Sequence, residues 1–566
     1  MPTADTAETN QPATRRPWWH RSVIYQIWLR SFYDANGDGC GDLAGVIAKL
    51  DYLAWLGVDA LWLSPLHPSP LFDSGYDVSD YLDVHPDLGD LATFDRLIAE
   101  AEQRNIRILL DFVPNHTSDQ HPWFLESRRS RDSDKRDWYV WKDPTPEGEP
   151  PNNWLAYFGD SVWKFDEQTE QYYLHTFYAE QPDLNWRNPE VRQAMYEVIR
   201  FWLERGVAGL RVDGLENMAK DPLFRDEPLD PYHLEHELPR FRMQKIYSVA
   251  HPDIHIILRE MRQVFDEYHE RLFIGEMSYS ASMRRTLSYY GHQDYNEVEM
   301  PLNFGLINLT DQNDWTARQL QNHINGFDVL TPTSGGLPNY ALGNHDKPRL
   351  AGRFGEAKRT AAVLLLTLRG TPFIYYGDEI GMEDVDIPLE QRRDRFSIDT
   401  PGHDRDGVRT PMRWQNAPHA GFCPPDQTPH LPVGDVPEQG DVHSQQDDPA
   451  SLLSMYRCLL QYRREQPALT IGDYYPLINL PESVVAYVRC WQDQRVLVVC
   501  NFAPEPHTLH FRTAEIAKLV LSTRVERQAN TDVTDVDLAA LELSGFEAVV
   551  LELTTSGSGI PKLADT

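Results

Sequence analysis

Short apolar runs alternate with longer segments whose apolar residues recur every three or four positions, from residue 23 to residue 375. A strand buried on both faces of a parallel sheet is apolar throughout, whereas a helix covering that sheet is apolar on one side only. The alternation therefore predicts parallel strands joined by helices. The strands are expected at residues 23–28, 59–63, 106–112, 209–212, 272–274 and 372–375.

Helix signals lie between these strands. Asp42 is a suitable N-cap for a helix that ends at Gly57, and a second helix is expected over residues 91–104. Asn188, followed by a proline, begins a third helix that ends at Gly206. Six or more such β–α repeats predict an α/β fold, a (β/α)8 TIM barrel with insertions.

Two stretches depart from this pattern. Residues 116–186 are rich in Trp, Tyr, Asp, Pro and Asn without a clear helical period, which indicates a small domain inserted after the third strand. Residues 383–448 form a polar, proline-rich stretch, expected as a long loop bordering the active-site face. After a helix over residues 451–464, alternating strands at 484–490, 495–502 and 546–553 predict a C-terminal antiparallel β-sandwich. The expected domains are a disordered tail (1–16), the barrel (17–115 and 187–468), the inserted domain (116–186) and the sandwich (469–566).

Composition narrows the function classes. The net charge of −33 repels phosphate backbones, so we expect no nucleic-acid or anionic-membrane partner. No apolar run reaches the roughly 18 residues of a membrane span, and the polar N-terminus lacks the apolar core of a signal peptide. Five cysteines without metal-type spacing favour a reducing compartment. We expect a cytoplasmic protein, monomeric or homodimeric.

Three acids follow candidate strands at the end where barrel enzymes place their catalytic groups. They are Asp213 in GLRVDG, Glu276 in FIGEM and Asp346 in GNHDKPR. Barrel closure would bring them into one pocket. The alternative is that each acid only caps a following helix, which is a reasonable account of one acid and a weak account of three.

The surroundings of two acids suggest different roles. Arg211 lies two residues before Asp213 on the same strand face, so its charge should depress the pKa of Asp213 and suit a nucleophile. A structural salt bridge would give the same pattern. Glu276 follows an apolar approach, which should raise its pKa and suit a general acid. Cleavage of an acetal needs such a pair of carboxyl groups.

Other polar residues accompany the acids. His116 and His345 lie in strand-end loops and could donate hydrogen bonds to sugar hydroxyls, although a lone histidine is more often structural. No zinc-type cluster accompanies them, so we expect no catalytic metal. Aromatic residues of the inserted segment could stack on sugars, although most should belong to a core; they are Trp154, Phe158, Trp163, Tyr172, Tyr173 and Phe177.

The stretch DANGDGCGD places oxygen-bearing side chains at alternate positions, with a glycine at the sixth position. This pattern resembles a calcium loop, but Gly45 occupies the twelfth position where an EF-hand requires Glu. A hard cation, Ca²⁺ or Mg²⁺, is expected as a structural ion; a plain polar turn is the alternative. The expected ligands are Asp34, Asn36, Asp38, Asp42 and the Cys40 carbonyl.

The motifs together resemble the oligo-1,6-glucosidase and α-glucosidase branch of the α-amylase superfamily (glycoside hydrolase family 13). The four short regions of that family appear in order, as DFVPNH at 111–116, GLRVDG at 209–214, FIGEM at 273–277 and GNHD at 343–346. Branch-type motifs such as FDSGYDVSDY, YYGDEIGM and DGVRTPMRW surround them. The similarity runs from Trp18 to the C-terminus.

This resemblance implies an exo-acting, retaining α-glucosidase that forms a covalent glucosyl-enzyme. Asp213 would be the nucleophile, Glu276 the acid/base, and Asp346 the acid that binds and distorts the glucose ring. Substrates would be short α-glucosides such as maltose, malto-oligosaccharides, sucrose or isomaltose. The implied pocket residues are Asp73 and Tyr76, the ring contacts His116, Arg211 and His345, the aromatic pair Phe158 and Phe177, and Arg409 or alternatively Arg405. The loop from Asp34 to Asp42 matches the family's calcium or magnesium loop.

Two departures limit this transfer. Gly214 follows the nucleophile where the branch usually carries Val, linked with α-1,6 preference, or Ala or Thr, linked with α-1,4 preference. The missing side chain enlarges the leaving-sugar subsite, and we favour α-1,4 linkages or broad tolerance. Residues 216–237 also lack the branch's common sequence, which leaves the aglycone side undefined.

Other functions remain open. A transglucosylase would share the chemistry up to the glucosyl-enzyme and differ only in the acceptor. A trehalose synthase fits the NHDKPR and GEM motifs less well. A non-catalytic amylase-like subunit of an amino-acid transporter should have lost catalytic acids and gained a membrane helix. A starch-binding module would not need a barrel.

Overall fold

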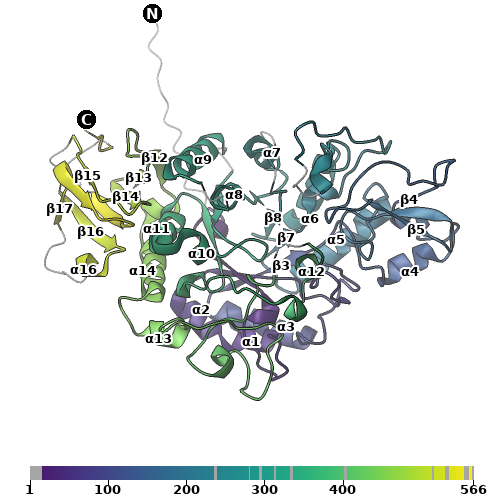
Figure 1. Ribbon diagram of the computed structural model, residues 1–566, viewed down its shortest axis with the longest axis horizontal. Helices are drawn as coiled ribbons and strands as arrows, with labels where there is room; N and C mark the ends of the chain where they lie inside the picture. Colours follow the sequence, from purple (N-terminus) through teal and green to yellow (C-terminus); the bar gives the residue numbers. More distant parts are fainter. Residues whose placement is uncertain are drawn as a thin grey trace, which may run out of the picture.

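The computed structural model describes residues 16–234, 239–279, 281–291, 296–311, 314–331, 336–400, 404–512, 516–528, 535–553 and 560–563. Eight parallel strands form one nearly closed sheet at the centre of the molecule (Figure 1), which confirms the predicted barrel. Their order is β10-β11-β1-β2-β3-β7-β8-β9. The strands are β1 (Ile24–Ile27), β2 (Ala60–Leu63), β3 (Arg107–Phe112), β7 (Gly209–Val212), β8 (Leu272–Gly275), β9 (Met300–Pro301), β10 (Asn339–Ala341) and β11 (Thr371–Tyr375).

The seam between β9 and β10 is closed by a side chain. The Asn339 amide donates to the carbonyl of Pro301, 2.7 Å away, and its oxygen accepts the backbone N–H of Asn303 at 2.9 Å. This one amide replaces the ladder bonds that join the other neighbouring strands. The sequence analysis did not find β9 and β10, because two or three residues are too few to show a strand period.

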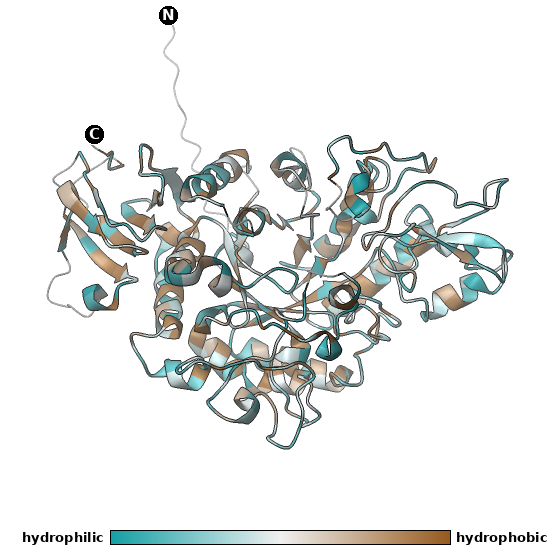
Figure 2. Ribbon diagram, viewed as in Figure 1, coloured by the Kyte–Doolittle hydropathy of each residue, from teal (hydrophilic) through white to brown (hydrophobic). Residues whose placement is uncertain are grey.

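Helices cover the outside of the barrel, with a hydrophobic side toward the sheet and a hydrophilic side toward solvent (Figure 2). The predicted helix after Asp42 is divided at Lys49, whose backbone leaves the helical range, into α1 and α2. Asn188 caps α5 as expected, accepting the N–H of Glu190. The helices are α1 (Leu43–Ala48), α2 (Leu50–Leu56), α3 (Leu91–Gln103), α5 (Pro189–Glu204), α6 (Ile254–Asp266), α7 (Met283–Ser288), α8 (Gly305–Thr310), α9 (Ala317–Leu330), α10 (Leu350–Phe354), α11 (Lys358–Thr367) and α14 (Leu452–Glu465). No helix of the described residues is long and apolar enough to cross a membrane.

The segment between β3 and α5 forms its own small unit at one side of the barrel (Figure 1). It contains α4 (Pro122–Arg128) and a three-stranded antiparallel sheet of β4 (Trp141–Lys142), β6 (Gln171–Leu174) and β5 (Trp163–Asp166). Trp154 and Trp163 are buried in a local core of this unit. The loop after β11, from residue 383 to residue 448, carries only short helices, among them α12 (Arg395–Asp399) and α13 (Val442–Gln446).

A C-terminal antiparallel domain packs on the opposite side of the barrel (Figure 1). Its larger sheet has the order β12-β13-β14-β19-β16-β17, and β15 pairs with β18 in a second sheet. Alternate residues of the central strands face the barrel helices and the second sheet, so both faces are buried. The elements are α15 (Pro467–Thr470), β12 (Asp473–Pro476), β13 (Val484–Trp491), β14 (Gln494–Asn501), β15 (His507–Leu509), β16 (Ile516–Ser522), α16 (Val525–Gln528), β17 (Asp535–Asp537), β18 (Leu541–Leu543) and β19 (Ala548–Leu553). The predicted N-terminal tail lies outside the described residues except for Arg16.

Two buried arginines join this domain to the barrel. Arg463 of α14 donates to the carbonyls of Leu366, Leu368 and Gly370, which lie in the last turn of α11 and in the link from α11 to β11. Arg489 of β13 donates to the carbonyl of Thr367 at 2.8 Å. Both guanidinium groups therefore satisfy main-chain oxygens that no helix or strand partner reaches.

We expect Arg463→Met to lower the stability of the protein by about 2–4 kcal/mol, because methionine keeps the aliphatic stem but leaves buried carbonyls unpaired. Thermal unfolding followed by circular dichroism measures the effect. Arg464→Met is the matched control, since that side chain is 56% exposed and its ion pair with Asp59 should contribute little. Equal melting temperatures for the two variants would contradict the proposed role.

Candidate active site

The catalytic candidates stand where β7 and β8 end. The N–H of Asp213 donates to the carbonyl of Phe112 at 2.8 Å, and the N–H of Glu276 donates to that of Val212 at 2.9 Å. These bonds continue the parallel ladders by one residue beyond the strands. Barrel geometry therefore fixes the backbone of both acids before any side-chain contact is made.

One guanidinium group joins three carboxyl groups in the pocket. Arg211 Nη1 lies 2.5 Å from Asp111 and 2.8 Å from Asp213, and its Nη2 lies 2.6 Å from Glu276. Only 1% of the Arg211 side chain is exposed. The second Glu276 oxygen accepts the N–H of Gly214 at 3.0 Å. Asp213 and Glu276 are thus held side by side through the two terminal nitrogens of one side chain.

Burial controls the protonation of this group. Burial and the Glu276 carboxylate raise the pKa of Asp213 well above its usual range, against the opposing charge of Arg211. Burial also raises the pKa of Asp111 to about 6. Arg211 does lower the pKa of Asp213, but the net decrease that we expected is wrong, because desolvation and a second carboxylate outweigh one cation. Asp213 therefore keeps its proton to higher pH than an isolated aspartic acid does.

Asp346 has the opposite environment. Burial favours its neutral form, but His345, Arg405 and Arg409 together lower the pKa of Asp346 below its usual range. Arg409 lies 2.9 Å from the carboxylate and Arg405 lies 3.5 Å from it. Burial lowers the pKa of His345 itself to about 3, so this ring is neutral near pH 7 and the two arginines keep Asp346 ionised.

The loop after β2 delivers Asp73 and Tyr76 to the same pocket. The Tyr76 hydroxyl lies 2.7 Å from Nε2 of His345, and it donates to Asp111 at 3.2 Å. His116 is fully buried, and its Nε2 lies 3.0 Å from the carbonyl of Tyr76. The five residues Asp73, Tyr76, Asp111, His116 and His345 thus belong to one connected polar network.

The structure places the two candidate arginines differently. Arg409 is fully buried, stacks over Trp28 at 4.2 Å and donates to the carbonyl of His345. Arg405 is less buried, and its guanidinium spans Asp73 at 3.1 Å and Asp346. Arg405 is therefore the arginine that closes the space between these two acids, while Arg409 supports Asp346 from behind.

Aromatic rings form one wall. Phe177 lies 5.1 Å from the His116 ring and 6.3 Å from Phe158. Phe158 stacks on Tyr178 at 4.0 Å. Gly214 faces this wall, since a Cβ built there would lie 3.5 Å from Phe177. The other aromatic residues singled out in the sequence, Trp154, Trp163, Tyr172 and Tyr173, belong to the core of the inserted segment or pack against it.

Sequence reasoning missed several members of this network. Asp111 had a usable signal, as the one acid within an otherwise apolar buried strand. Gln181 donates to Asp73 at 3.0 Å, and Asp394 binds both arginines. Neither residue had a usable signal, because loop residues follow no periodic pattern of polar and apolar positions. Gln26 of β1 binds Nδ1 of His345 at 2.7 Å.

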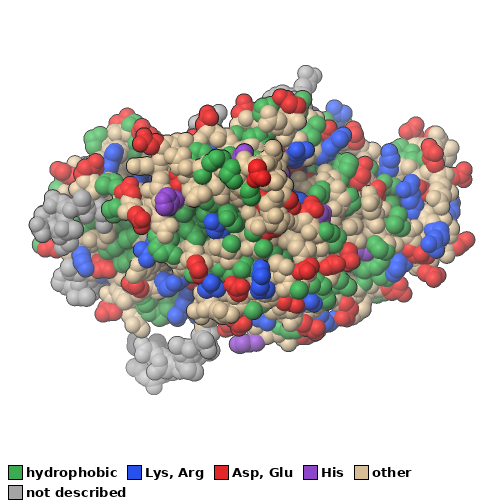
Figure 3. Space-filling model, turned by 90° about the horizontal axis from the view of Figure 1, so that it is seen from below, with side chains coloured by type: hydrophobic (Ala, Val, Ile, Leu, Met, Phe, Trp, Pro, Cys, Tyr) green, Lys and Arg blue, Asp and Glu red, His purple; other side chains and the backbone are tan. Residues whose placement is uncertain are grey.

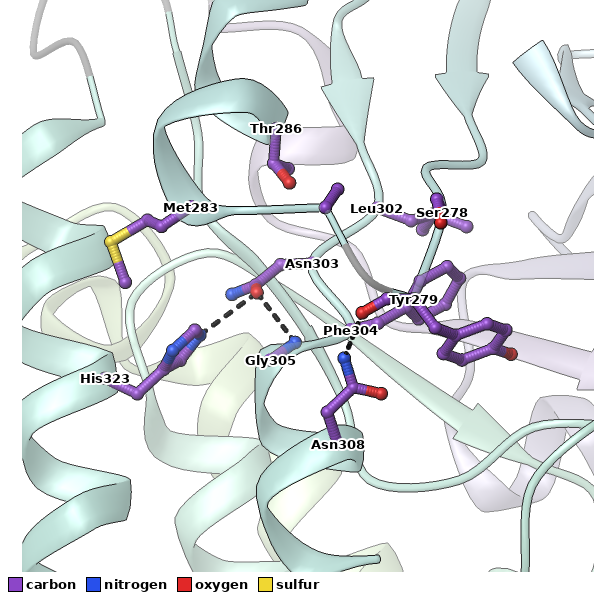
Figure 4. Close-up of a pocket in the computed structure, with 11 residues that line it drawn as sticks. Ser278, Tyr279, Met283, Thr286, Leu302, Asn303, Phe304, Gly305, Asn308 and His323 are labelled. Carbon is purple, nitrogen blue, oxygen red and sulfur yellow. Dashed lines mark hydrogen bonds between the residues drawn. The ribbon is translucent and has the colours of Figure 1, made fainter. Parts of the chain in front are cut away.

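A cavity of about 30 Å³ lies behind the loop that follows Glu276, between Tyr279, Asn303 and His323 (Figure 4). The Asn303 oxygen accepts from the His323 ring and from the N–H of Gly305, and Asn308 donates to the carbonyl of Tyr279. The Asn303 amide nitrogen has no partner among the described residues. The space suits one water molecule and is too small for a sugar.

The predicted metal loop is folded around its own acids. Asp34 accepts the N–H groups of Gly37 and Gly39, and Asp42 accepts that of Gly45. Each carboxylate retains lone pairs for a cation, and the oxygen-only donor set fits Ca²⁺ or Mg²⁺. No three His, Cys, Asp or Glu side chains in the described ranges converge as a metal cluster. The ion therefore stays a prediction.

Comparison with known proteins defines the family. A model described as "Alpha amylase, catalytic domain" matches residues 26–472. The chain belongs to the α-amylase family. This family member is 35% identical to an oligo-1,6-glucosidase of Parageobacillus thermoglucosidasius, over 95% of the chain and 99% of the relative. It is 38% identical to a probable α-glucosidase of Rhizobium meliloti, over 87% of the chain and 91% of that relative. Among solved structures, the α-glucosyl transfer enzyme XgtA superposes with a TM-score of 0.87 at 36% identity. The match covers 95% of this chain and 100% of the XgtA chain.

We expect Arg405→Met to reduce kcat/KM for α-glucosides by on the order of 10²-fold, because it leaves Asp73 and Asp346 without a shared cation. The loss of positive charge should raise the pKa of Asp346, so the acid-side decline of activity should begin at a higher pH. A pH profile of kcat/KM measures both effects. Arg395→Met, which removes an exposed ion pair with Asp399, should change neither; a matching decline would exclude a specific role for Arg405.

Proposed function

We propose that this enzyme is a retaining, exo-acting α-glucosidase for short α-glucosides. Asp213 acts as nucleophile, Glu276 as acid/base, and Asp346 binds the glucose unit that is cleaved off. The observation that carries the proposal is the Arg211 guanidinium, which holds the Asp213 and Glu276 carboxyl groups side by side. A buried pair that keeps one proton supplies both an acid and an anion, as glycosidic cleavage requires.

The spacing of the pair supports retention of configuration. Carboxyl groups bound to neighbouring nitrogens of one guanidinium fit the shorter separation of about 5–5.5 Å that is typical of retaining glycosidases. Inverting enzymes need a wider gap that holds a water molecule. In the proposed sequence Glu276 protonates the leaving oxygen while Asp213 forms a bond to the anomeric carbon. Glu276 then takes a proton from water, which releases glucose and frees Asp213.

The closed side of the pocket supports exo action. Arg405 joins Asp73 to Asp346 across the space beyond the acids, and Phe158 and Phe177 form the adjoining wall. A chain could not continue past a glucose unit held there. One glucose at the non-reducing end is therefore the expected product, and starch a poor substrate.

Gly214 bears on the linkage. Its φ of 51° is in the left-handed region, and a side chain there would approach Phe177 and the Asn217 amide. Its absence leaves room beside the leaving sugar, and we favour maltose-type α-1,4 linkages. The similarity to an oligo-1,6-glucosidase makes isomaltose the necessary comparison substrate.

Transglucosylation is the second candidate, because the XgtA structure, similar over nearly the whole chain, is that of a glucosyl transfer enzyme. Transfer and hydrolysis share the glucosyl-Asp213 intermediate and differ in whether a sugar hydroxyl or water attacks it. Product analysis at high maltose separates them, since transfer yields trisaccharides and hydrolysis yields glucose alone.

We expect Asp213→Ala and Glu276→Ala each to reduce turnover of maltose by at least about 10³-fold. Added azide should restore activity on an α-glucoside with an activated phenol leaving group, and the configuration of the product assigns the roles. Asp213→Ala should give β-glucosyl azide, because azide then attacks the substrate directly. Glu276→Ala should give α-glucosyl azide, because azide attacks the glucosyl-enzyme. Proton NMR of the anomeric signal measures the outcome.

Glu204→Ala, a change on the outer helix α5, is the control and should keep normal turnover without azide. The reverse assignment of anomers would exchange the two roles, and near-normal turnover of Asp213→Ala would exclude the mechanism.

A structural Ca²⁺ or Mg²⁺ ion held by the loop from Asp34 to Asp42 is also part of the proposal, supported by the oxygen donors and their spacing. After chelation, saturating Ca²⁺ should raise the melting temperature by several degrees, since a ligand at 100 times its Kd adds ~2.7 kcal/mol. Asp38→Asn should weaken this shift, whereas Asp143→Asn, a surface change in the inserted segment, should not. An identical shift in both variants would place the ion elsewhere.

A further inference from the structure

Two cations meet on the ring of Tyr157. The Arg240 guanidinium lies 4.1 Å from the ring centroid and donates to the Tyr157 carbonyl at 2.9 Å. The Lys245 ammonium lies 6.0 Å from the same centroid. Both residues belong to the loop between β7 and α6.

Tyr157 places these cations beside the reaction centre. Its ring lies 5.6 Å from Phe177 and 5.4 Å from Phe158, the two aromatic residues of the glucose wall. The charges of Asp346 and Glu276 both act on the Tyr157 hydroxyl. The closed end of the pocket, at Asp73 and Arg405, is already occupied by ion pairs. Tyr157 therefore adjoins Phe177, the part of the wall that Gly214 faces, where the leaving sugar is expected.

Neither cation forms an ion pair with a residue that the structure describes. Within the described ranges, no carboxylate lies within 4.0 Å of Arg240 or Lys245, unlike Arg405 with its three acids. The nearest acid that acts on Lys245 is Glu227, whose oxygens accept the N–H groups of Ile246, Tyr247 and Ser248. Nη2 of Arg240 and Nζ of Lys245 make no hydrogen bond to a described residue. Both side chains are partly exposed.

This arrangement is unfavourable without a ligand. Burial lowers the pKa of Lys245 to about 8, and the charge of Arg240 adds to that effect. Acidic and basic side chains are interspersed on the face that Figure 3 shows, and the chain carries a net charge of −33. A bound anion would stabilise two neighbouring, partly exposed cations that have no carboxylate partner among the described residues.

We infer that Arg240 and Lys245 form an anion subsite, and that the preferred substrate is an α-glucoside whose leaving group carries a phosphate or carboxylate. The inference rests on the proposed glucosidase function. Arg240 offers a planar guanidinium edge and Lys245 a point charge, a combination that accepts either anion. The neutral glucose enters the acidic interior, while the charged leaving group stays beside the two cations.

The test compares three substrates that share the same type of scissile bond. They are maltose, maltose phosphorylated on O6 of the reducing glucose, and the aldonate maltobionate. We expect wild-type kcat/KM to be about tenfold or more higher for at least one anionic substrate than for maltose, with the preference falling as salt rises. The two anionic arms distinguish phosphate from carboxylate as the recognised group.

Variants connect the preference to the subsite. Arg240→Met and Lys245→Met should each reduce the anionic-to-neutral ratio of kcat/KM severalfold, and the double variant should bring it near one, while the maltose value changes little. Arg242→Met removes an exposed cation two residues from Arg240 and should leave the ratio unchanged. The maltose value serves as the internal control for folding.

Three results would overturn the inference. Equal kcat/KM for neutral and anionic substrates would do so while leaving the glucosidase function intact. An anionic preference unchanged in the double variant would place recognition elsewhere. Hydrolysis of none of the three substrates, nor of isomaltose or sucrose, would instead refute the proposed function itself.

Discussion

The buried Arg211 guanidinium is the interaction on which the pocket depends. A carboxylate moved into the interior loses its hydration, and three of them so close together would repel one another as well. One arginine on β7 contacts Asp111, Asp213 and Glu276, and it offsets much of that cost. Three neighbouring strands are therefore joined at their carboxyl ends by charge as well as by main-chain hydrogen bonds.

In the other half of the pocket, arginines again offset the cost of burying carboxylates. Around Asp346 two arginines face one acid, and Asp394 positions both of them from outside. Asp213 shares one arginine with two other carboxyl groups and its pKa is raised, whereas Asp346 meets two arginines and its pKa is lowered. Neighbouring carboxylates of one pocket thus acquire different protonation from the number of arginines that each one meets.

Much of this was accessible from the sequence. Apolar runs located six strands, and Asp213 and Glu276 after two of them located the proposed reaction centre, because strand ends of a parallel barrel converge wherever the loops go. The seam strands β9 and β10 and the pairing of Arg405 with Asp73 were not accessible. They depend on where long loops return in space, and residues 332 positions apart leave no periodic trace. The protonation of Asp213 was misjudged for a related reason, since one adjacent cation is visible in a sequence while the depth of burial is not.

The amide of Asn339 has a consequence for how the barrel survives unfolding stress. A sheet joined across its last seam by a side chain still has two edge strands in the hydrogen-bonding sense. Long edges invite pairing with another chain, but β9 has two residues and β10 has three, fewer than a stable added strand requires. The brevity that hides these strands from sequence analysis therefore also protects the protein from edge-to-edge aggregation.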